Sequence, residues 1–309
     1  MTGTEPQGPV GVLVMAYGTP EDYGDVAAFY ADVRRGRPPA AEQLADLEGR
    51  YRAIGGVSQL RTRTEEQVNG IAAALEEHTA GRFRCAYGAK HAEPTIETTV
   101  AALRAEGIRR LVGLVLAPHY SSASVGEYLL RAQAACEAAG IEARFVEDWH
   151  DNAELIALLA ERVRAALSLV AGDNVELLVS AHSLPLRVIE AGDGYDERLA
   201  ETARLVAAAV PTERFTVCWQ SAGRTPERWI GPDVLEVLRR LAAEECDGVV
   251  VCPAGFVSDH LEISYDLDIE ARRLAGELGL GFARTESLNA DGRLCRALAR
   301  LVAKEAEDW

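Results

Sequence analysis

The chain has 309 residues, and its 48% hydrophobic content is sufficient for two α/β domains with cores of their own. Its formal net charge of −16 argues against nucleic-acid binding, because phosphate recognition requires a basic face. The chain has neither a signal-peptide pattern nor an apolar run of the roughly 18 residues that a membrane span requires. We therefore expect a cytoplasmic protein without membrane insertion.

Strand-like apolar segments alternate with helical patterns along the whole sequence. These segments are residues 11–15, 82–86, 111–116, 142–146, 175–179, 214–219, 249–252 and 281–284. Such alternation is typical of parallel sheets flanked by helices, and the number of strands indicates two sheets. We predict an α/β protein with two Rossmann-like domains, residues 1–150 and 151–290, and a cleft between them. The last helix lies within residues 291–309, and we leave open that it packs on the first domain.

An arginine cluster follows the helical pattern of residues 27–33, where Arg34-Arg35-Gly36-Arg37 forms a typical helix stop. Arginines at a helix C-terminus also stabilise the helix dipole, which is a purely structural explanation. In so acidic a chain, however, these guanidinium groups suit bidentate recognition of substrate carboxylates. Arg50 and Tyr51 follow with similar chemistry, so the sequence favours a planar, carboxylated ligand.

His182 lies just past the predicted buried strand of residues 175–179, in the segment Ser180-Ala181-His182-Ser183-Leu184-Pro185. Ligands of open α/β sheets bind at this carboxyl edge. An imidazole there can ligate a metal or take up a proton near neutral pH. The alternative is a histidine that only forms hydrogen bonds with the loop backbone.

A row of carboxylates follows the predicted strand of residues 249–252, on a helix expected over residues 259–278. Glu262, Asp266 and Glu270 recur every four residues and therefore lie along one side of that helix. Such a row suits a divalent cation that moves inward to a site at the helix start. The alternative for Glu262 is a capping-box carboxylate behind an N-cap at residue 259.

A short internal repeat supports the division into two halves. Residues 13–20 can be laid over residues 178–185, which makes Tyr17 the counterpart of His182. A weaker pair of matching segments is 93–95 and 225–227. If the halves face one another, Tyr17 and His182 border one interdomain cleft from opposite sides. The alternative is that the two segments adopt the same strand-and-turn geometry independently and are not a repeat.

Six cysteines are scattered without a C-x-x-C pair, and most lie in apolar patterns, so we expect reduced core residues. Neither common glycine-rich phosphate-binding motif occurs, which removes the usual support for a nucleotide cofactor. We expect no permanently bound cofactor.

With these residues in view, the chain resembles the ferrochelatases, in particular the soluble bacterial type that acts on coproporphyrin III. The matching motifs are residues 14–20, 34–37, 50–51, 90–91, 180–185, 220–223 and 256–268. The resemblance implies two chelatase-type domains and a lyase of haem biosynthesis that inserts Fe2+, its substrate, into coproporphyrin III. It is also compatible with transient contacts with other enzymes of the haem pathway.

The resemblance also implies roles for individual residues. His182 and Glu262 would bind the incoming Fe2+, and Tyr17 would approach the iron from the opposite face of the macrocycle. The implied substrate contacts are Tyr17, Arg34, Arg50, Tyr51, Ser58 and Tyr128. Tyr17 further favours the four-carboxylate substrate, because relatives that use protoporphyrin IX typically carry methionine there. A neutral imidazole can act both as a general base and as a metal ligand, so His182 is our choice for the proton acceptor.

Some members of this family hold a [2Fe-2S] cluster, which uses a cysteine where this chain has Val125 and further cysteines in a C-terminal extension. We expect no such cluster, because no cysteine follows Cys295. Gln59 and Ser264 also depart from the family pattern. The open alternatives are a protoporphyrin IX ferrochelatase, a cobalt or nickel chelatase for a related tetrapyrrole, and a non-catalytic porphyrin or haem carrier.

Overall fold

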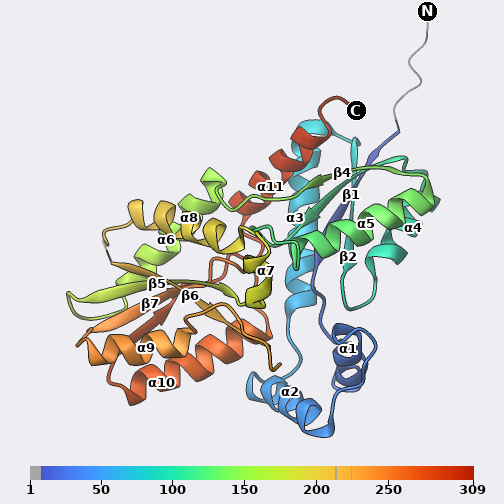
Figure 1. Ribbon diagram of the computed structural model, residues 1–309. Coiled ribbons are helices and arrows are strands. Elements are labelled where there is room, and N and C mark those ends of the chain that lie inside the picture. The colour runs from blue at the N-terminus through green and yellow to red at the C-terminus, as the bar shows by residue number, and fades with distance from the viewer. Residues whose placement is uncertain (1–7, 213, 224) are drawn as a thin grey trace, which may run out of the picture.

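Two four-stranded parallel sheets form the framework of the computed structural model, which describes residues 8–212, 214–223 and 225–309 (Figure 1). The first sheet has the order β2-β1-β3-β4, with β1 Val10–Ala16, β2 Phe83–Ala89, β3 Arg110–Val115 and β4 Glu142–Val146. The second has the order β6-β5-β7-β8, with β5 Val175–His182, β6 Phe215–Gln220, β7 Gly248–Cys252 and β8 Gly281–Arg284. Each of the eight predicted strand segments overlaps one of these strands, so the predicted α/β class with two parallel sheets is confirmed.

The central strands are mostly apolar because helices cover both faces of each sheet. Every residue of β1 and of β7 is buried. The register places Met15 of β1 opposite Gly88 of β2 and Val115 of β3. The carboxyl ends of these strands therefore meet at one edge of the sheet, and Tyr17 follows there.

Helices α4 and α5 cover one face of the first sheet, and α3 and α11 cover the other. The bounds of these helices are α3 Leu60–Thr79, α4 Ile96–Ala105, α5 Val125–Ala139 and α11 Gly292–Glu305. Helix α11 packs against α3 and also contacts α6 and β4. The last helix thus returns to the first half of the chain.

On the second sheet, α6 and α8 lie on one face, and α9, η1 and α10 lie on the other. Their bounds are α6 Ala153–Leu167, α8 Tyr195–Ala208, α9 Val234–Ala243, the π-helix η1 Ile263–Ala271 and α10 Arg272–Glu277. The short helix α7 spans Leu186–Glu190. One continuous core joins the α3 and α11 side of the first sheet to the α6 and α8 side of the second.

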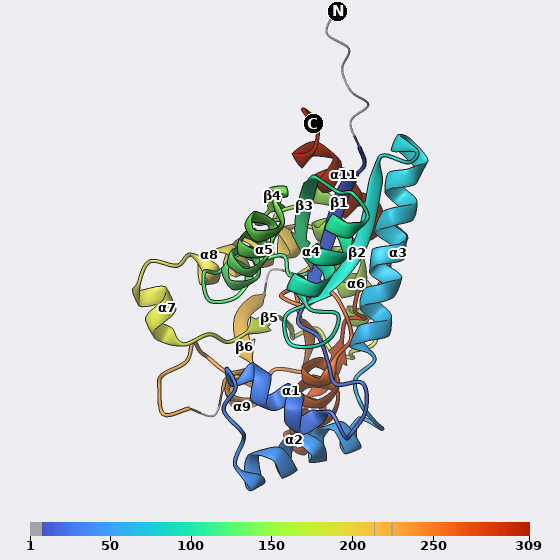
Figure 2. The same ribbon diagram turned by 90° about the vertical axis from the view of Figure 1, so that its right-hand side faces the viewer.

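Helices α1 (Val26–Val33) and α2 (Ala41–Ala53) form a pair that stands apart from both sheets (Figures 1 and 2). Arg50 of α2 reaches Asp266 of η1, so this pair also bridges to the second half. Within the part of the chain that the structure describes, no helix combines the length and apolar character needed to cross a bilayer.

The internal repeat corresponds to two sheets of identical strand order, with β1 in the place of β5. Tyr17 follows β1 directly, and His182 is the last residue of β5. The weaker match between residues 93–95 and 225–227 is wrong, however. The counterpart of residues 93–95 is 231–233. Near the end of β2, Ala89 forms a parallel bridge with Thr95, the residue after a cis proline, and near the end of β6, Trp219 forms the same bridge with Asp233.

Candidate active site

A cleft of about 1,110 Å³ opens between the two halves at the carboxyl edges of their sheets. Both halves contribute lining residues, among them Tyr17, Lys90, His91, Tyr128, His182, Trp229, Phe256, His260 and Glu262. Tyr17 and His182 therefore border the same cavity. This is the arrangement that the internal repeat predicts.

Glycines allow close packing within each wall of this cleft. At Gly18 the chain turns with a φ of +90°, and a Cβ there would lie 2.9 Å from that of Ala92. At Gly255 a Cβ would lie 2.5 Å from the Cβ of Ala181, so the loop after β7 can rest directly on β5. The next residue, Phe256, lines the cleft together with His182.

His182 presents one ring nitrogen to the cleft and uses the other to fix its orientation. A carbonyl oxygen can only accept, so Nδ1 carries the hydrogen that His182 donates to the backbone oxygen of Ser183, at 2.5 Å. Nε2 lies 3.5 Å from Oε1 of Glu262, whose Oε2 lies 3.5 Å from Nε2 of His260. His182 therefore does form the hydrogen bond to the loop backbone, but this bond leaves Nε2 free to bind a metal ion or a proton.

The carboxylate of Glu262 stands between the imidazoles of His182 and His260, and the pKa values of His182 and Glu262 are shifted in opposite directions. Burial lowers the pKa of His182, but the charge of Glu262 and the hydrogen bonds to Glu262 and to the Ser183 backbone together outweigh burial and raise the pKa to about 9. Burial would likewise raise the pKa of Glu262, but His182 and His260 hold it well below its usual range. Without metal, His182 and Glu262 form an ion pair, so a bound cation must displace a proton.

Glu262 does not serve as a capping-box carboxylate. The backbone N–H of Asp259 donates to Oδ1 of Asn289 at 3.0 Å, and the Asp259 carboxylate accepts hydrogen bonds from Ser287 and Asn289. Asp259 is thus engaged with the loop after β8, and the helical segment starts at Leu261. The helix expected over residues 259–278 is observed over residues 261–277, but residues 263–271 within it form a π-helix.

A second cavity of about 320 Å³ adjoins the cleft and shares Glu262 with it. Asp266, Glu270 and Arg50 also line it. Nη1 of Arg50 lies 3.1 Å from Oδ1 of Asp266, and the hydroxyl of Ser221 donates to Oδ2 at 2.5 Å. Burial and the charge of Glu262 raise the pKa of Asp266 to about 6. The row of carboxylates therefore leads from this side cavity to the cleft.

Tyr17 faces the cleft with 42% of its surface exposed. Its ring packs edge-on against that of His91, with centroids 4.7 Å apart, and Nδ1 of His91 lies 2.7 Å from Oδ2 of Asp32. Burial of the hydroxyl in the cleft and the charge of Glu262 raise the pKa of Tyr17 above its usual range, so this hydroxyl is protonated at neutral pH.

The residues implied as substrate contacts fall into three groups. Tyr128 lines the cleft with Tyr17, and the ammonium of Lys90 lies 4.9 Å above the Tyr128 ring. Arg50 lines the side cavity. Among the described residues that line either cavity, Arg34, Tyr51 and Ser58 are missing.

Each residue of this third group has another neighbour. The guanidinium of Arg34 lies 5.6 Å from the ring of Tyr30, and Ser58 accepts a hydrogen bond from the backbone N–H of Leu60 at 3.2 Å. Tyr51 is buried, which raises its pKa to about 12. Arg35, not Arg34, lines the cleft, and its guanidinium pairs with Glu127 at 3.1 Å.

Sequence reasoning missed His260 and Phe256 as cleft residues, although both lie close to Glu262 in the chain. Their rings pack together with centroids 4.8 Å apart. In the part of the chain that the structure describes, no cluster of three or more His, Cys, Asp or Glu side chains is arranged to hold a metal ion. His182 and Glu262 thus offer one nitrogen and one oxygen donor to a cation.

Comparison with known proteins identifies the family. The family model described as Ferrochelatase matches residues 9–306. The chain belongs to the ferrochelatase family. The coproporphyrin III ferrochelatase of Geobacillus kaustophilus (strain HTA426) is 43% identical over 300 residues, covering 95% of both chains. The coproporphyrin III ferrochelatase 2 of Bacillus anthracis is 39% identical over 303 residues, covering 97% of this chain and 95% of the relative.

Solved structures of other chelatases share the fold of this ferrochelatase family member. The sirohydrochlorin chelatase SirB from Bacillus subtilis subspecies spizizenii in complex with cobalt superposes with a TM-score of 0.59 at 12% identity, covering 97% of this chain and 96% of the other. CbiX, the terminal enzyme for siroheme biosynthesis in denitrifying bacteria, gives 0.55 at 16% identity, covering 95% and 98%. Both structures confirm the chelatase-type architecture of the two halves.

Proposed function

We propose that this chain inserts ferrous iron into coproporphyrin III to form coproheme, as a metal chelatase of the lyase class. The observation that carries the proposal is the His182–Glu262 pair across the cleft from Tyr17, in a chain about 40% identical over nearly its full length to coproporphyrin III ferrochelatases. At about 1,110 Å³ the cleft is slightly larger than the usual range of small-molecule sites, roughly 300–1,000 Å³, and so suits a macrocycle.

Insertion requires that two pyrrole N–H protons leave the macrocycle and that the flat ring bends to expose its nitrogen lone pairs. A rigid cleft that binds the bent ring more tightly than the flat ring lowers the barrier by differential binding. Nε2 of His182 is the proton acceptor in this scheme, since Nδ1 is fixed by the Ser183 carbonyl. The Glu262 carboxylate supplies a hard oxygen donor for Fe2+ and offsets its charge.

The ion pair between His182 and Glu262 makes the arrival of the cation and the loss of a proton one linked event. His182 holds a proton at neutral pH in the metal-free chain, because its pKa is about 9. Fe2+ that binds at this site displaces that proton to solvent, and once the cation has moved on to the macrocycle, the freed Nε2 can accept a proton from a pyrrole nitrogen. The row of Glu262, Asp266 and Glu270 is the proposed entry route for the cation.

We further propose that the protein acts in the cytoplasm without a permanently bound cofactor or [2Fe-2S] cluster, and that contacts with other haem-pathway enzymes are transient. The cysteines support this proposal: Cys85 is half-buried, the other five are buried, and all six are free thiols. Val125, in the position where some relatives hold the cluster, is fully buried at the start of α5.

An anaerobic assay with ferrous iron tests the function, with coproporphyrin III and protoporphyrin IX measured side by side. We expect many turnovers per chain, and a higher kcat/KM for coproporphyrin III. Saturation at one porphyrin per chain without metal insertion would indicate a carrier. A clear preference for protoporphyrin IX would assign the other substrate.

A further inference from the structure

Tyr195, the first residue of α8, forms a hydrogen bond with the main chain of His182. Its hydroxyl donates to the backbone oxygen of His182 at 3.1 Å, and only 6% of its surface is exposed. His182 is the last residue of β5, where the support of the sheet ends. Tyr195 therefore anchors the peptide that carries the imidazole at the point where the strand becomes a loop.

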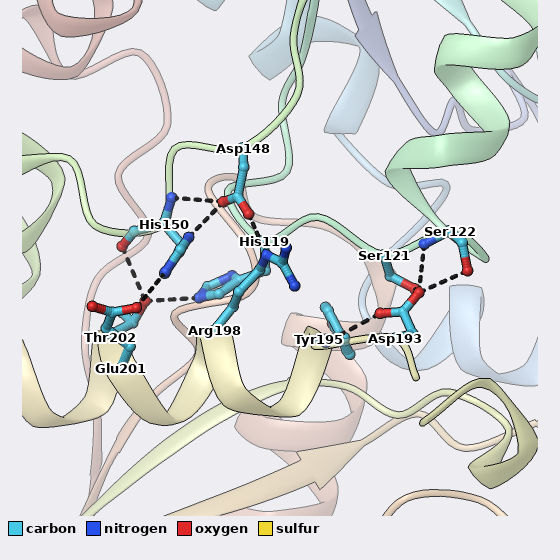
Figure 3. Close-up of polar contacts among 10 residues, drawn as sticks. All are labelled: His119, Ser121, Ser122, Asp148, His150, Asp193, Tyr195, Arg198, Glu201 and Thr202. Carbon is cyan, nitrogen blue, oxygen red and sulfur yellow. Dashed lines mark hydrogen bonds and ion pairs between the residues drawn. The ribbon is translucent and has the colours of Figure 1, made fainter. Parts of the chain in front are cut away.

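Asp193 connects Tyr195 to the first half of the molecule (Figure 3). Its Oδ1 accepts the backbone N–H of Tyr195 at 3.1 Å. Its Oδ2 accepts hydrogen bonds from the Ser121 hydroxyl at 3.1 Å and from the backbone N–H and hydroxyl of Ser122, both at 2.7 Å. These serines lie in the loop that follows β3, so this carboxylate joins that loop to the start of α8.

The same loop also contacts the ring of Tyr195. His119 meets the Tyr195 ring edge-on, with centroids 6.4 Å apart and an interplanar angle of 90°. Thr202 donates its hydroxyl hydrogen to the backbone oxygen of His150 at 3.0 Å, so at 2.9 Å it accepts the Nε2–H of His119 (Figure 3). The hydrogen bond to Thr202 fixes the His119 ring. On another side of Tyr195, the ring of Trp219 packs with centroids 5.4 Å apart.

We propose that Tyr195 is a positioning residue for His182 and that Asp193, through its bonds to the β3 loop, sets where Tyr195 stands. The inference rests on the proposed function insofar as His182 is taken to be a metal ligand. A small shift of the His182 peptide changes the 3.5 Å separation between Nε2 and the Glu262 carboxylate, and with it the span between the two donor atoms. Metal affinity responds strongly to groups that orient ligands, typically about 10- to 100-fold.

The first test is the full-length variant Tyr195→Phe, which keeps the ring and removes only the hydroxyl. Zn2+ binding is measured by calorimetry without porphyrin, with wild type and His182→Ala as references and Tyr87→Phe as a control outside the cleft. We expect about tenfold weaker Zn2+ binding at the His182 site, unchanged coproporphyrin binding and a wild-type value for Tyr87→Phe. Zn2+ binding within twofold of wild type in Tyr195→Phe, or undiminished binding in His182→Ala, would overturn the proposal.

The second test asks whether Asp193 acts through Tyr195. We expect Asp193→Asn alone to weaken Zn2+ binding, and the double variant with Tyr195→Phe to bind Zn2+ no more weakly than Tyr195→Phe alone. Additive losses would show that the two residues act independently. If Asp193→Asn does not fold, Ser122→Ala removes one donor to the same carboxylate and replaces it in the cycle. Zn2+ binding needs no turnover, so a failed iron-insertion assay would refute the proposed function and leave this result intact.

Discussion

At the scale of single residues, the site depends on two donors that neutralise each other until a cation arrives. His182 and Glu262 are charged in the metal-free chain, and their pKa values are displaced in the directions that ion pairing requires. One nitrogen and one oxygen donor bind a divalent ion without the closed coordination of a structural site. That combination suits a cation that must be passed on to a porphyrin.

Replacing His182 with alanine should therefore stop insertion and leave porphyrin binding in place. We expect the kcat for iron insertion to fall by at least about 100-fold, since general-base contributions are typically 10²- to 10⁴-fold. Fluorescence quenching should report a coproporphyrin affinity close to that of wild type. His78→Ala, at the far end of α3, serves as the control. Substantial turnover in His182→Ala would exclude the imidazole as the proton acceptor.

Individual site residues differed in how far the sequence predicted them. His182, Glu262 and Tyr17 could be found because strand ends, helix periodicity and the internal repeat place them on one rim. The sequence also named Arg34 and Ser58, which line neither cavity among the described residues. Which way such side chains point depends on how α1 and α2 pack, and local patterns carry no information on that packing.

At the scale of elements, the π-helix η1 determines how the carboxylates reach the cleft. A π-helix closes i→i+5 hydrogen bonds, so residues four apart remain on nearly one side. Glu262 and Asp266 consequently both face the side cavity, and Glu270 lies further along its wall. The sequence predicted the row and the strand before it. It did not predict the wider helix, because apolar periodicity does not distinguish i→i+4 from i→i+5 bonding, and the loop after β8 engages Asp259 instead of leaving it as a cap.

Glu270→Gln should weaken iron capture more than catalysis. We expect the KM for Fe2+ to rise about two- to threefold with little change in kcat, because one negative charge is lost along the entry route. The matched control is Glu277→Gln on α10, which removes the same charge from the exposed end of the helix. The difference between the variants should shrink at high salt, because screening weakens exposed charges. Equal effects of both variants would mean that only the net charge matters.

At the scale of the whole molecule, two halves of the same strand order are held in one relative position. A continuous core passes from one sheet to the other, and polar contacts add to it, such as His119 with Thr202 and Asp148 with Arg198 (Figure 3). The sequence predicted the duplication and the cleft. It did not predict these ties, which join side chains 50 or more positions apart.

His119 gives this junction between the halves a defined dependence on pH. Burial, together with the like charge of the neighbouring His150, lowers the pKa of His119 to about 3, against about 6.5 for an unperturbed histidine. The charge of Asp148 acts in the opposite direction, and that of Arg198 acts with His150. Between pH 3 and 6.5 the unfolded chain binds a proton that the folded chain does not, so this histidine contributes full stability above 6.5 and loses it on acidification.

His119→Gln should remove that part of the acid sensitivity, since glutamine can still donate to Thr202 but does not titrate. Between pH 7.5 and 5.5 we expect the free energy of unfolding of wild type to fall by about 1 kcal/mol more than that of the variant. Urea titrations at the two pH values measure the difference, and His78→Gln on α3 controls for the loss of a histidine as such. Equal acid sensitivity of wild type and His119→Gln would show that His119 already binds its proton in the folded chain. The contact between His119 and Thr202 would then not be what makes the junction sensitive to acid.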